Sequence, residues 1–269
     1  MSGNSVIEKR KMIRLTLKPN LIKTEITDVV ARDEPIYIFI NEEYHVTLIS
    51  TPLEKKELAT GFLFCEGIID SAADIQSIKL RGKDVYVNLK KKVDLRAASV
   101  DRMNLITTAC GSSPTPSPKQ ITLHRISSTL KMNPETILEM VRELSKRSKI
   151  HMSTGGTHAA MLCSKEGEVL AFAEDIGRHN AIDKVIGSMI LKEKTLLDCI
   201  LISSGRQSAE MVHKAVQARI PIVASMAAPL SSGIKLADMA GITLVCFIRG
   251  TRLQIYTVPQ RIEYNLYHF

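Results

Sequence analysis

The sequence predicts an α/β fold (α+β overall), in which a mixed sheet with flanking helices forms the C-terminal half and a smaller α+β region precedes it. After residue 178, short apolar runs alternate with amphipathic segments, a rhythm typical of parallel strands joined by helices. Hydrophobic residues make up 45% and charged residues 24%, an ordinary globular mixture. Residues 107–118 separate the two halves, because ten of these twelve residues are Thr, Ser, Pro or Gly.

The first half contains three predictable elements. Two apolar runs, 37–40 and 46–49, flank the polar residues 41–43 and predict a hairpin. Residues 53–65 have the apolar spacing of a helix that ends at Gly67. Residues 84–89 alternate between apolar and polar types and predict a strand.

The second half has a more regular pattern. Asn133 and Pro134 are a typical start for a helix, and its apolar stripe continues to basic residues at 146–147. We expect a hairpin from residues 157–163 and 169–173. Helices should follow at 179–192, 208–218 and 234–240, with strands at 199–202, 222–224 and 242–248 and an antiparallel return at 253–257.

These patterns divide the chain into four segments. They are a basic N-terminal arm (1–24), a small α+β region (25–106), a cysteine loop that we expect to be mobile (107–119), and an α/β cofactor-binding domain (120–269). The formal net charge is +8, and six Lys or Arg with one acid lie before residue 24. Such an arm either attracts an anionic partner or is simply a solvated terminus.

The sequence also indicates the compartment. No apolar run reaches the length of a transmembrane helix, and the N-terminus lacks the features of a secretory signal. The five cysteines are odd in number and widely spaced, which favours free thiols in a reducing environment. We therefore expect a cytoplasmic protein that does not act at a membrane. No cysteine or histidine spacing predicts a metal site.

Cys110 differs from the other four cysteines. Those four lie in apolar runs, where a cysteine is usually buried and inert. They are Cys65, Cys163, Cys199 and Cys246. Cys110 lies in the polar loop, where its sulfur is expected to be accessible and able to carry a second sulfur as a persulfide. From spacing alone, an incidental loop cysteine is the alternative.

Four polar loops in the second half each adjoin a predicted strand or helix. They cover residues 153–158, 177–180, 203–208 and 229–233. Ligands of α/β sheets bind beyond the carboxyl ends of strands, where helix N-termini attract anions. We therefore expect a phosphate-bearing ligand here, although Ser and Gly also serve as ordinary helix caps. The candidate binding residues are Gly155, Gly156, His158, Arg178, His179, Ser204, Gly205 and Arg206.

A further candidate lies near the C-terminus. The segment comprises Phe247, Ile248, Arg249, Gly250, Thr251 and Arg252. Its arginines could hold a phosphate while its phenylalanine packs under a base, or the segment could be a basic turn. Elsewhere in the second half, the acids Glu174, Asp175 and Asp183 lie beside Arg178 and His179 in the sequence. They could orient a catalytic His or Arg, but an ion-pair network that ties a strand end to the next helix is the favoured interpretation.

Seven sequence blocks together resemble the formate dehydrogenase accessory sulfurtransferase family, often called FdhD. The blocks are ATGFLFCEGII (59–69), TTACG (107–111), STGGTHAAML (153–162), EDIGRHNAIDKVIG (174–187), SSGRQSAEMVHKA (203–215), residues 226–250 and the closing QIYT. The resemblance spans about residues 35–257. Its long blocks occur in the family order, which makes the match specific.

The resemblance implies a function and a set of partners. Members take persulfide sulfur from a cysteine desulfurase and pass it to the molybdenum or tungsten bis-pyranopterin guanine dinucleotide cofactor, for use by formate dehydrogenase. It implies a cytidine deaminase-like fold and a homodimer. The persulfide would form on Cys110, and residues 247–252 would bind the cofactor as cargo. The zinc-binding pattern of deaminases is absent from the sequence, so no metal is expected.

One position departs from the family pattern. Many members have a CxxC pair in the loop, whereas Ser113 stands where the second cysteine would be. Sulfur release that needs two loop cysteines is therefore in doubt. A non-catalytic chaperone that binds and delivers the cofactor is the alternative function. Nucleic-acid binding is disfavoured, because the chain has no Trp and its basic excess is not interleaved with stacking residues.

Overall fold

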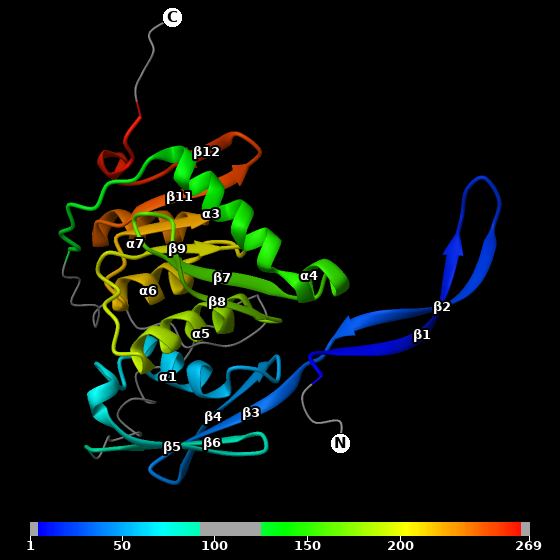
Figure 1. Cartoon of the computed structure of the whole chain (residues 1–269), viewed down its shortest axis with the longest axis horizontal. Helices are drawn as coiled ribbons and strands as arrows, with labels where there is room; N and C mark the ends of the chain where they lie inside the picture. The colour runs from blue at the N-terminus through cyan, green and yellow to red at the C-terminus, as the bar shows by residue number, and fades with distance from the viewer. Residues whose placement is uncertain (1–4, 92–124, 265–269) are drawn as a thin grey trace, which may run out of the picture.

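The computed structural model describes residues 5–91 and 125–264. Its core is built from two mixed sheets with a layer of helices between them (Figure 1). The predicted α/β class is confirmed. The specific likeness to cytidine deaminases stays a prediction.

The larger sheet has six strands in the order β12-β11-β10-β9-β7-β8. Its strands β9, β10 and β11 run parallel, while β7, β8 and β12 pair antiparallel with their neighbours. The bounds are β7 (His158–Cys163), β8 (Val169–Asp175), β9 (Ile200–Ser203), β10 (Ile222–Ser225), β11 (Thr243–Arg249) and β12 (Arg252–Ile255).

Helices cover both faces of this sheet. One face packs on α3 (Pro134–Arg147), which Asn133 caps by accepting a hydrogen bond from the backbone N–H of Glu135. The other face packs on α5 (Arg178–Leu191), α6 (Ala209–Gln217) and α7 (Ser231–Ala240). Short helices α4 (Lys149–Thr154) and η2 (Pro259–Arg261) complete the second half.

The smaller sheet has four strands in the order β4-β3-β6-β5. They are β3 (Glu34–Ile40), β4 (Glu43–Ser50), β5 (Ile75–Arg81) and β6 (Asp84–Leu89), with η1 (Ala72–Asp74) before β5. One face packs on α1 (Lys55–Cys65), and α1 packs in turn on α5. One hydrophobic core therefore joins both halves.

Helices α1 and α5 approach each other closely because of two glycines. A Cβ added at Gly61 would lie 1.7 Å from the backbone oxygen of Asp183, and one added at Gly187 would lie 1.9 Å from that of Glu57. Only glycine fits at either position, since no real side chain tolerates such distances. The crossing holds the small sheet against the large domain.

The predicted elements of both halves are confirmed, with ends shifted by up to three residues. Strand β5 and helix α4 were not predicted. Neither were β1 (Ile7–Thr16) and β2 (Ile22–Ala31), which form a long hairpin. We call residues 7–31 the arm; it extends beyond the predicted end at residue 24 and projects away from the body (Figure 1). The cysteine loop 107–119 lies outside the described residues.

Candidate functional site

The described candidate residues gather at one edge of the six-stranded sheet. Strands β8, β9, β10 and β11 all end there, and β7 begins there, as the registers show. Ser203 pairs with Ser225 on one side and with Ala160 on the other. The prediction that polar loops follow neighbouring strands to a common edge is therefore correct for β8, β9 and β10.

His158 and Ser204 form the centre of this edge. The His158 Nδ1 atom lies 3.3 Å from the Ser204 hydroxyl oxygen, which also accepts a 2.9 Å hydrogen bond from the backbone N–H of Ala159. Burial lowers the pKa of His158 below its ordinary value of 6.5, and the nearby positive charge of Arg178 lowers it further. The imidazole is therefore neutral at pH 7.

Arg178 lies directly against the loop that follows β9. It is the first residue of α5, and a Cβ added at Gly205 would lie 2.8 Å from the Arg178 Cβ. Gly205 thus permits the close approach of the arginine. The structure brings together His158, Arg178, Ser204 and Gly205, four of the predicted ligand residues. A cation, a hydroxyl and backbone N–H groups at a helix N-terminus are suited to an anion.

Two other predicted residues near this site differ from these four in their surroundings. His179 is buried, and its Nε2 atom lies 3.2 Å from a carboxylate oxygen of Glu210 on α6. It therefore ties α5 to α6. Arg206 follows Gly205 and is exposed to solvent.

Gln207 is a residue that sequence reasoning missed. It is completely buried, and its Nε2 donates a 2.8 Å hydrogen bond to the carbonyl of Gly205. The hydroxyl of Ser225 donates to the same carbonyl at 2.7 Å. These two side chains fix the loop that carries Ser204. Their polarity in the sequence could not distinguish them from exposed loop residues.

The predicted segment 247–252 lies along the same edge, beyond β10. Phe247 has φ 51°, a strained value for a residue other than glycine, and its backbone N–H donates to the carbonyl of Ala227. The Arg249 guanidinium carbon lies 6.0 Å from the Phe247 ring centre, and Arg249 pairs in register with Arg252. Both arginines are exposed, as are Gly250 and Thr251, whereas Ile248 is buried in the core.

Gly155 and Gly156 lie at the other end of the edge, next to the arm. Gly155 ends α4 with φ 66°, and its N–H donates to the carbonyl of His151. A Cβ added at Gly156 would lie 3.1 Å from the Ala31 Cβ at the end of β2. The structure therefore places these glycines at the base of the arm, two and three residues before His158.

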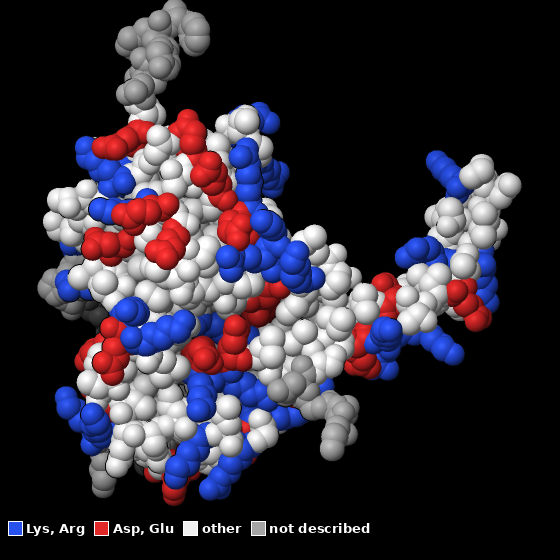
Figure 2. Space-filling model, viewed as in Figure 1, with Lys and Arg blue, Asp and Glu red and all other residues white. Residues whose placement is uncertain are grey.

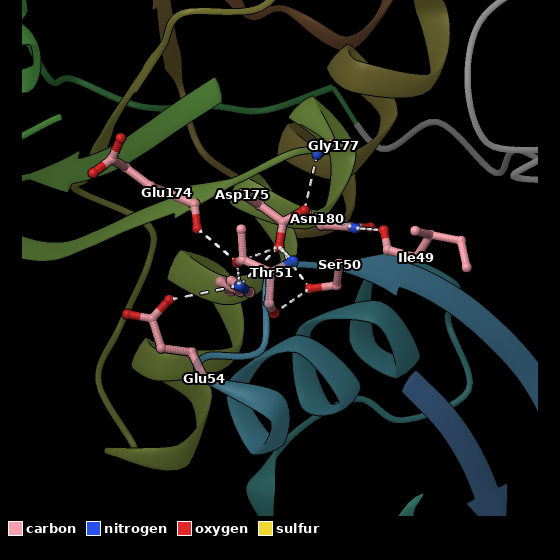
Figure 3. Close-up of polar contacts among 9 residues, drawn as sticks. Ile49, Ser50, Thr51, Glu54, Glu174, Asp175, Gly177 and Asn180 are labelled. Carbon is pink, nitrogen blue, oxygen red and sulfur yellow. Dashed lines mark hydrogen bonds and ion pairs between the residues drawn. The ribbon is translucent and has the colours of Figure 1, made fainter. Parts of the chain in front are cut away.

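A buried polar cluster connects the two halves below the edge, and we call it the joint. It consists of Ser50, Thr51, Asp175, Asn180 and Lys184 (Figure 3). The Lys184 ammonium lies 2.7 Å from an Asp175 carboxylate oxygen. That oxygen also accepts hydrogen bonds from the Ser50 hydroxyl at 2.6 Å and the Thr51 N–H at 3.1 Å. The Asn180 amide donates to the other oxygen at 2.9 Å.

The three acids singled out in the sequence all have structural partners. Asp183 forms a second buried ion pair, with its carboxylate oxygens 2.7 and 2.9 Å from the Lys214 nitrogen. The favoured ion-pair interpretation is therefore confirmed for Asp175 and Asp183, whose partners are lysines and not Arg178 or His179. Glu174 instead accepts hydrogen bonds from the backbone N–H groups of Ile150 and His151 at the start of α4 and from the Thr157 hydroxyl.

The four cysteines that the structure describes are all buried. Burial raises the pKa of Cys163 and Cys246 to about 12 and that of Cys199 to about 11. It also raises the pKa of Cys65 well above its ordinary value. These thiols are protonated at pH 7 and poorly nucleophilic. Cys110 lies outside the described residues.

The described chain contains neither a cluster of metal-ligating side chains nor a membrane-spanning helix. Within residues 5–91 and 125–264, no group of three His, Cys, Asp or Glu side chains is arranged to hold a metal ion. In the same ranges, no helix has both the length and the apolar character needed to cross a membrane.

Comparison with known proteins identifies the relatives of this chain. The family model described as FdhD/NarQ matches residues 31–263. A sulfur carrier protein FdhD from Sulfolobus acidocaldarius is 38% identical, over 88% of this chain and 92% of that protein. One from Thermoplasma acidophilum is 35% identical over 88% of each chain. One from Streptomyces coelicolor is 32% identical over 96% of each.

A solved structure shares the fold. It is a crystal structure from Desulfotalea psychrophila assigned as a formate dehydrogenase accessory protein, with a TM-score of 0.80 and 25% identity. The similarity covers 96% of this chain and all of that one. With the family model matching most of the sequence, the chain belongs to the FdhD/NarQ family.

Proposed function

We propose that the protein is a sulfur carrier that supports formate dehydrogenase. The observation that carries this proposal is the burial of the four described cysteines, which leaves Cys110 as the remaining thiol of the chain. A carrier needs an accessible thiol that can ionise. The names of the relatives, sulfur carrier protein FdhD and formate dehydrogenase accessory protein, support the same role.

The loading step is a thiol–persulfide exchange. The Cys110 thiolate attacks the outer sulfur of a persulfide on a cysteine desulfurase, and the desulfurase thiolate leaves. One S–S bond breaks and another forms, so no oxidant or reductant is needed. The protein is in this sense a sulfurtransferase, and a single loop cysteine is sufficient for loading despite Ser113.

The acceptor of the sulfur is a molybdenum or tungsten bis-pyranopterin guanine dinucleotide, bound as cargo. Its phosphates are suited to the edge formed by His158, Arg178, Ser204 and Gly205. There the Arg178 guanidinium supplies a positive charge, and the neighbouring groups supply hydrogen-bond donors. Phe247, Arg249 and Arg252 would contact its guanine end. The resemblance also implies a homodimer and action in the cytoplasm, and both remain part of the proposal.

Mass spectrometry of the intact protein tests the carrier function. After incubation with a cysteine desulfurase and cysteine, the wild type should gain one sulfur atom that a reductant removes. Cys110→Ser should gain none, whereas the control Cys199→Ala should load like the wild type. Sulfur on Cys110→Ser would contradict the proposal.

Binding of GDP, as a probe of the guanine end, tests the cargo site. Arg249→Ala with Arg252→Ala should weaken binding on the order of tenfold or more, since each charged hydrogen bond contributes about 1.5–3 kcal/mol. The control Lys165→Ala removes an exposed charge in the β7–β8 turn and should leave binding unchanged. Unchanged binding in the double variant would show that the cargo binds elsewhere. If sulfur loading fails while binding persists, the cofactor-chaperone function is favoured.

A further inference from the structure

The His158 ring has one nitrogen engaged by the protein and one that is not. Its Nδ1 atom lies 3.3 Å from the Ser204 hydroxyl oxygen, which the backbone N–H of Ala159 holds in place. Within residues 5–91 and 125–264, no group of the protein hydrogen-bonds the other ring nitrogen, Nε2. His158 is half-buried, at the start of β7. The ring is therefore fixed on one side, and its second nitrogen is left for a ligand.

The surroundings of His158 disfavour a proton on its ring when the protein is alone. Burial lowers the pKa of His158 below 6.5, and the positive charge of Arg178 on α5 lowers it further. His151 on α4 and His179 on α5 act in the same direction, with smaller effects. Two positive charges side by side are costly in a partly buried site, so the guanidinium is charged and the imidazole is neutral.

The acids on the neighbouring strand β8 are committed to other partners. Asp175 pairs in register with His158 and favours its protonation, but that carboxylate is held by Lys184. Glu174 accepts hydrogen bonds from backbone N–H groups at the start of α4 and from the Thr157 hydroxyl. A proton on His158 therefore needs negative charge from outside the described part of the chain.

A ligand at this edge has to be selected by local charge. Residues 125–264 contain eighteen Lys or Arg and thirteen Asp or Glu. Figure 2 shows both signs interspersed on the visible face of the body, so no broad field of one sign covers that face. The phosphates of the proposed cargo form a pyrophosphate diester, which carries two negative charges. Arg178 neutralises one of them, and the second is left for the neighbouring ring of His158.

We propose that His158 takes up a proton from solvent when a pyrophosphate diester binds at this edge, so that an imidazolium and the Arg178 guanidinium each face one negative charge. An imidazolium donates from both ring nitrogens. Its Nδ1–H then donates to the Ser204 oxygen and its Nε2–H to the ligand. When the ligand leaves, the proton returns to solvent. The inference rests on the proposed cargo site and adds to it the charge of the ligand and the coupled proton.

Proton uptake makes ligand affinity depend on pH with a definite sign. The bound anion favours the imidazolium, so the pKa of His158 is higher in the complex than in the free protein. Affinity therefore increases as the pH falls through the pKa of the complex, and it levels off below the pKa of the free protein. A rise of about one pKa unit on binding corresponds to about a tenfold change in affinity.

Isothermal titration calorimetry of the full chain with diguanosine pyrophosphate tests the proposal. The phosphates of this probe are diesters that keep their charge between about pH 5.5 and 8, so any proton taken up goes to the protein. The wild type should bind on the order of tenfold more tightly at the lower pH, and buffers of different ionisation enthalpy should reveal net proton uptake. His158→Gln should show neither effect. The control His213→Gln removes a histidine of α6 whose pKa is also lowered, and it should keep both.

An NMR titration of the His158 ring follows the proton directly. Saturating probe should raise the midpoint by about one pH unit, and Arg178→Gln should raise the midpoint of the free protein because the competing charge is gone. A midpoint that the probe leaves unchanged, or a pH dependence that persists in His158→Gln, would overturn the inference and leave the cargo site in place. A probe that does not bind at any pH would overturn both. Sulfur loading of His158→Gln shows separately whether the carrier function is intact.

Discussion

In the arm, six lysine and arginine side chains project into solvent, whereas in the joint one lysine and one aspartate are completely buried. The arm could lose a charge with little effect on its own folding, since exposed charges contribute at most about 1 kcal/mol. The joint could not lose a charge with little effect on folding, because Asp175 and Lys184 depend on each other. Asp175 also depends on hydrogen bonds from Ser50, Thr51 and Asn180. Similar side chains are thus solvated in one region and support folding in the other.

The largest expected effect is the loss of one partner in the joint. Asp175→Ala leaves the Lys184 ammonium buried without its carboxylate, which should lower the free energy of unfolding by about 3–5 kcal/mol. Urea denaturation followed by circular dichroism measures it. The control Glu54→Gln removes a partly exposed carboxylate 3.9 Å from the same ammonium and should cost about 1 kcal/mol or less. Equal effects of the two variants would show that the joint does not hold the halves together.

A smaller loss is expected where α1 crosses α5. Gly187→Ala places a methyl group against the backbone oxygen of Glu57 and should lower the free energy of unfolding by about 1–3 kcal/mol. Ser188→Ala, at the next position of the same helix, should change it by less than about 0.5 kcal/mol. Denaturation under the same conditions compares them. A neutral Gly187→Ala would mean that the helices can separate without loss of stability.

The next largest expected effect is a pH dependence of stability that comes from His158. Because the pKa of His158 lies below 6.5 in the folded protein, the unfolded chain binds the proton more readily. Stability from this residue is therefore present above pH 6.5 and is lost as the pH falls from 6.5 through the folded pKa. An NMR titration of the His158 ring should give a midpoint below 6.5. A midpoint at or above 6.5 would contradict the buried, cation-flanked environment.

The smallest effect concerns the arm. Leu17→Ser with Leu21→Ser should leave the melting temperature of the dilute protein unchanged, because both side chains are exposed and contribute little to folding. Differential scanning calorimetry of the dilute protein checks this. A dilute variant that melts much earlier would show that the arm stabilises its own body.

The helices and strands of the larger domain were predicted well because the sequence patterns that identify them are local. Apolar spacing and a capped start identify α3, and short apolar runs identify β9, β10 and β11. The arm was missed because its strands carry charges on both faces and lack the alternation of a half-buried strand. Its pairing depends on the partner strand and not on burial.

The candidate site was predictable only in part. The loops after β8 and β9 could be expected at one edge, and Arg178 does lie against Gly205. Gln207 and the joint depend on contacts between residues far apart in the chain, such as Thr51 with Asp175. The roles of His179 and Ile248 could not be read from motifs, since burial by the surrounding fold decides which atoms face a ligand.

The central claim is that Cys110 carries sulfur, and intact-protein mass spectrometry after reaction with a cysteine desulfurase and cysteine tests it most directly. The account predicts one added sulfur atom on the wild type, reversed by a reductant, absent from Cys110→Ser and retained in Cys199→Ala. No added sulfur on the wild type, or an equal gain on Cys110→Ser, would contradict it.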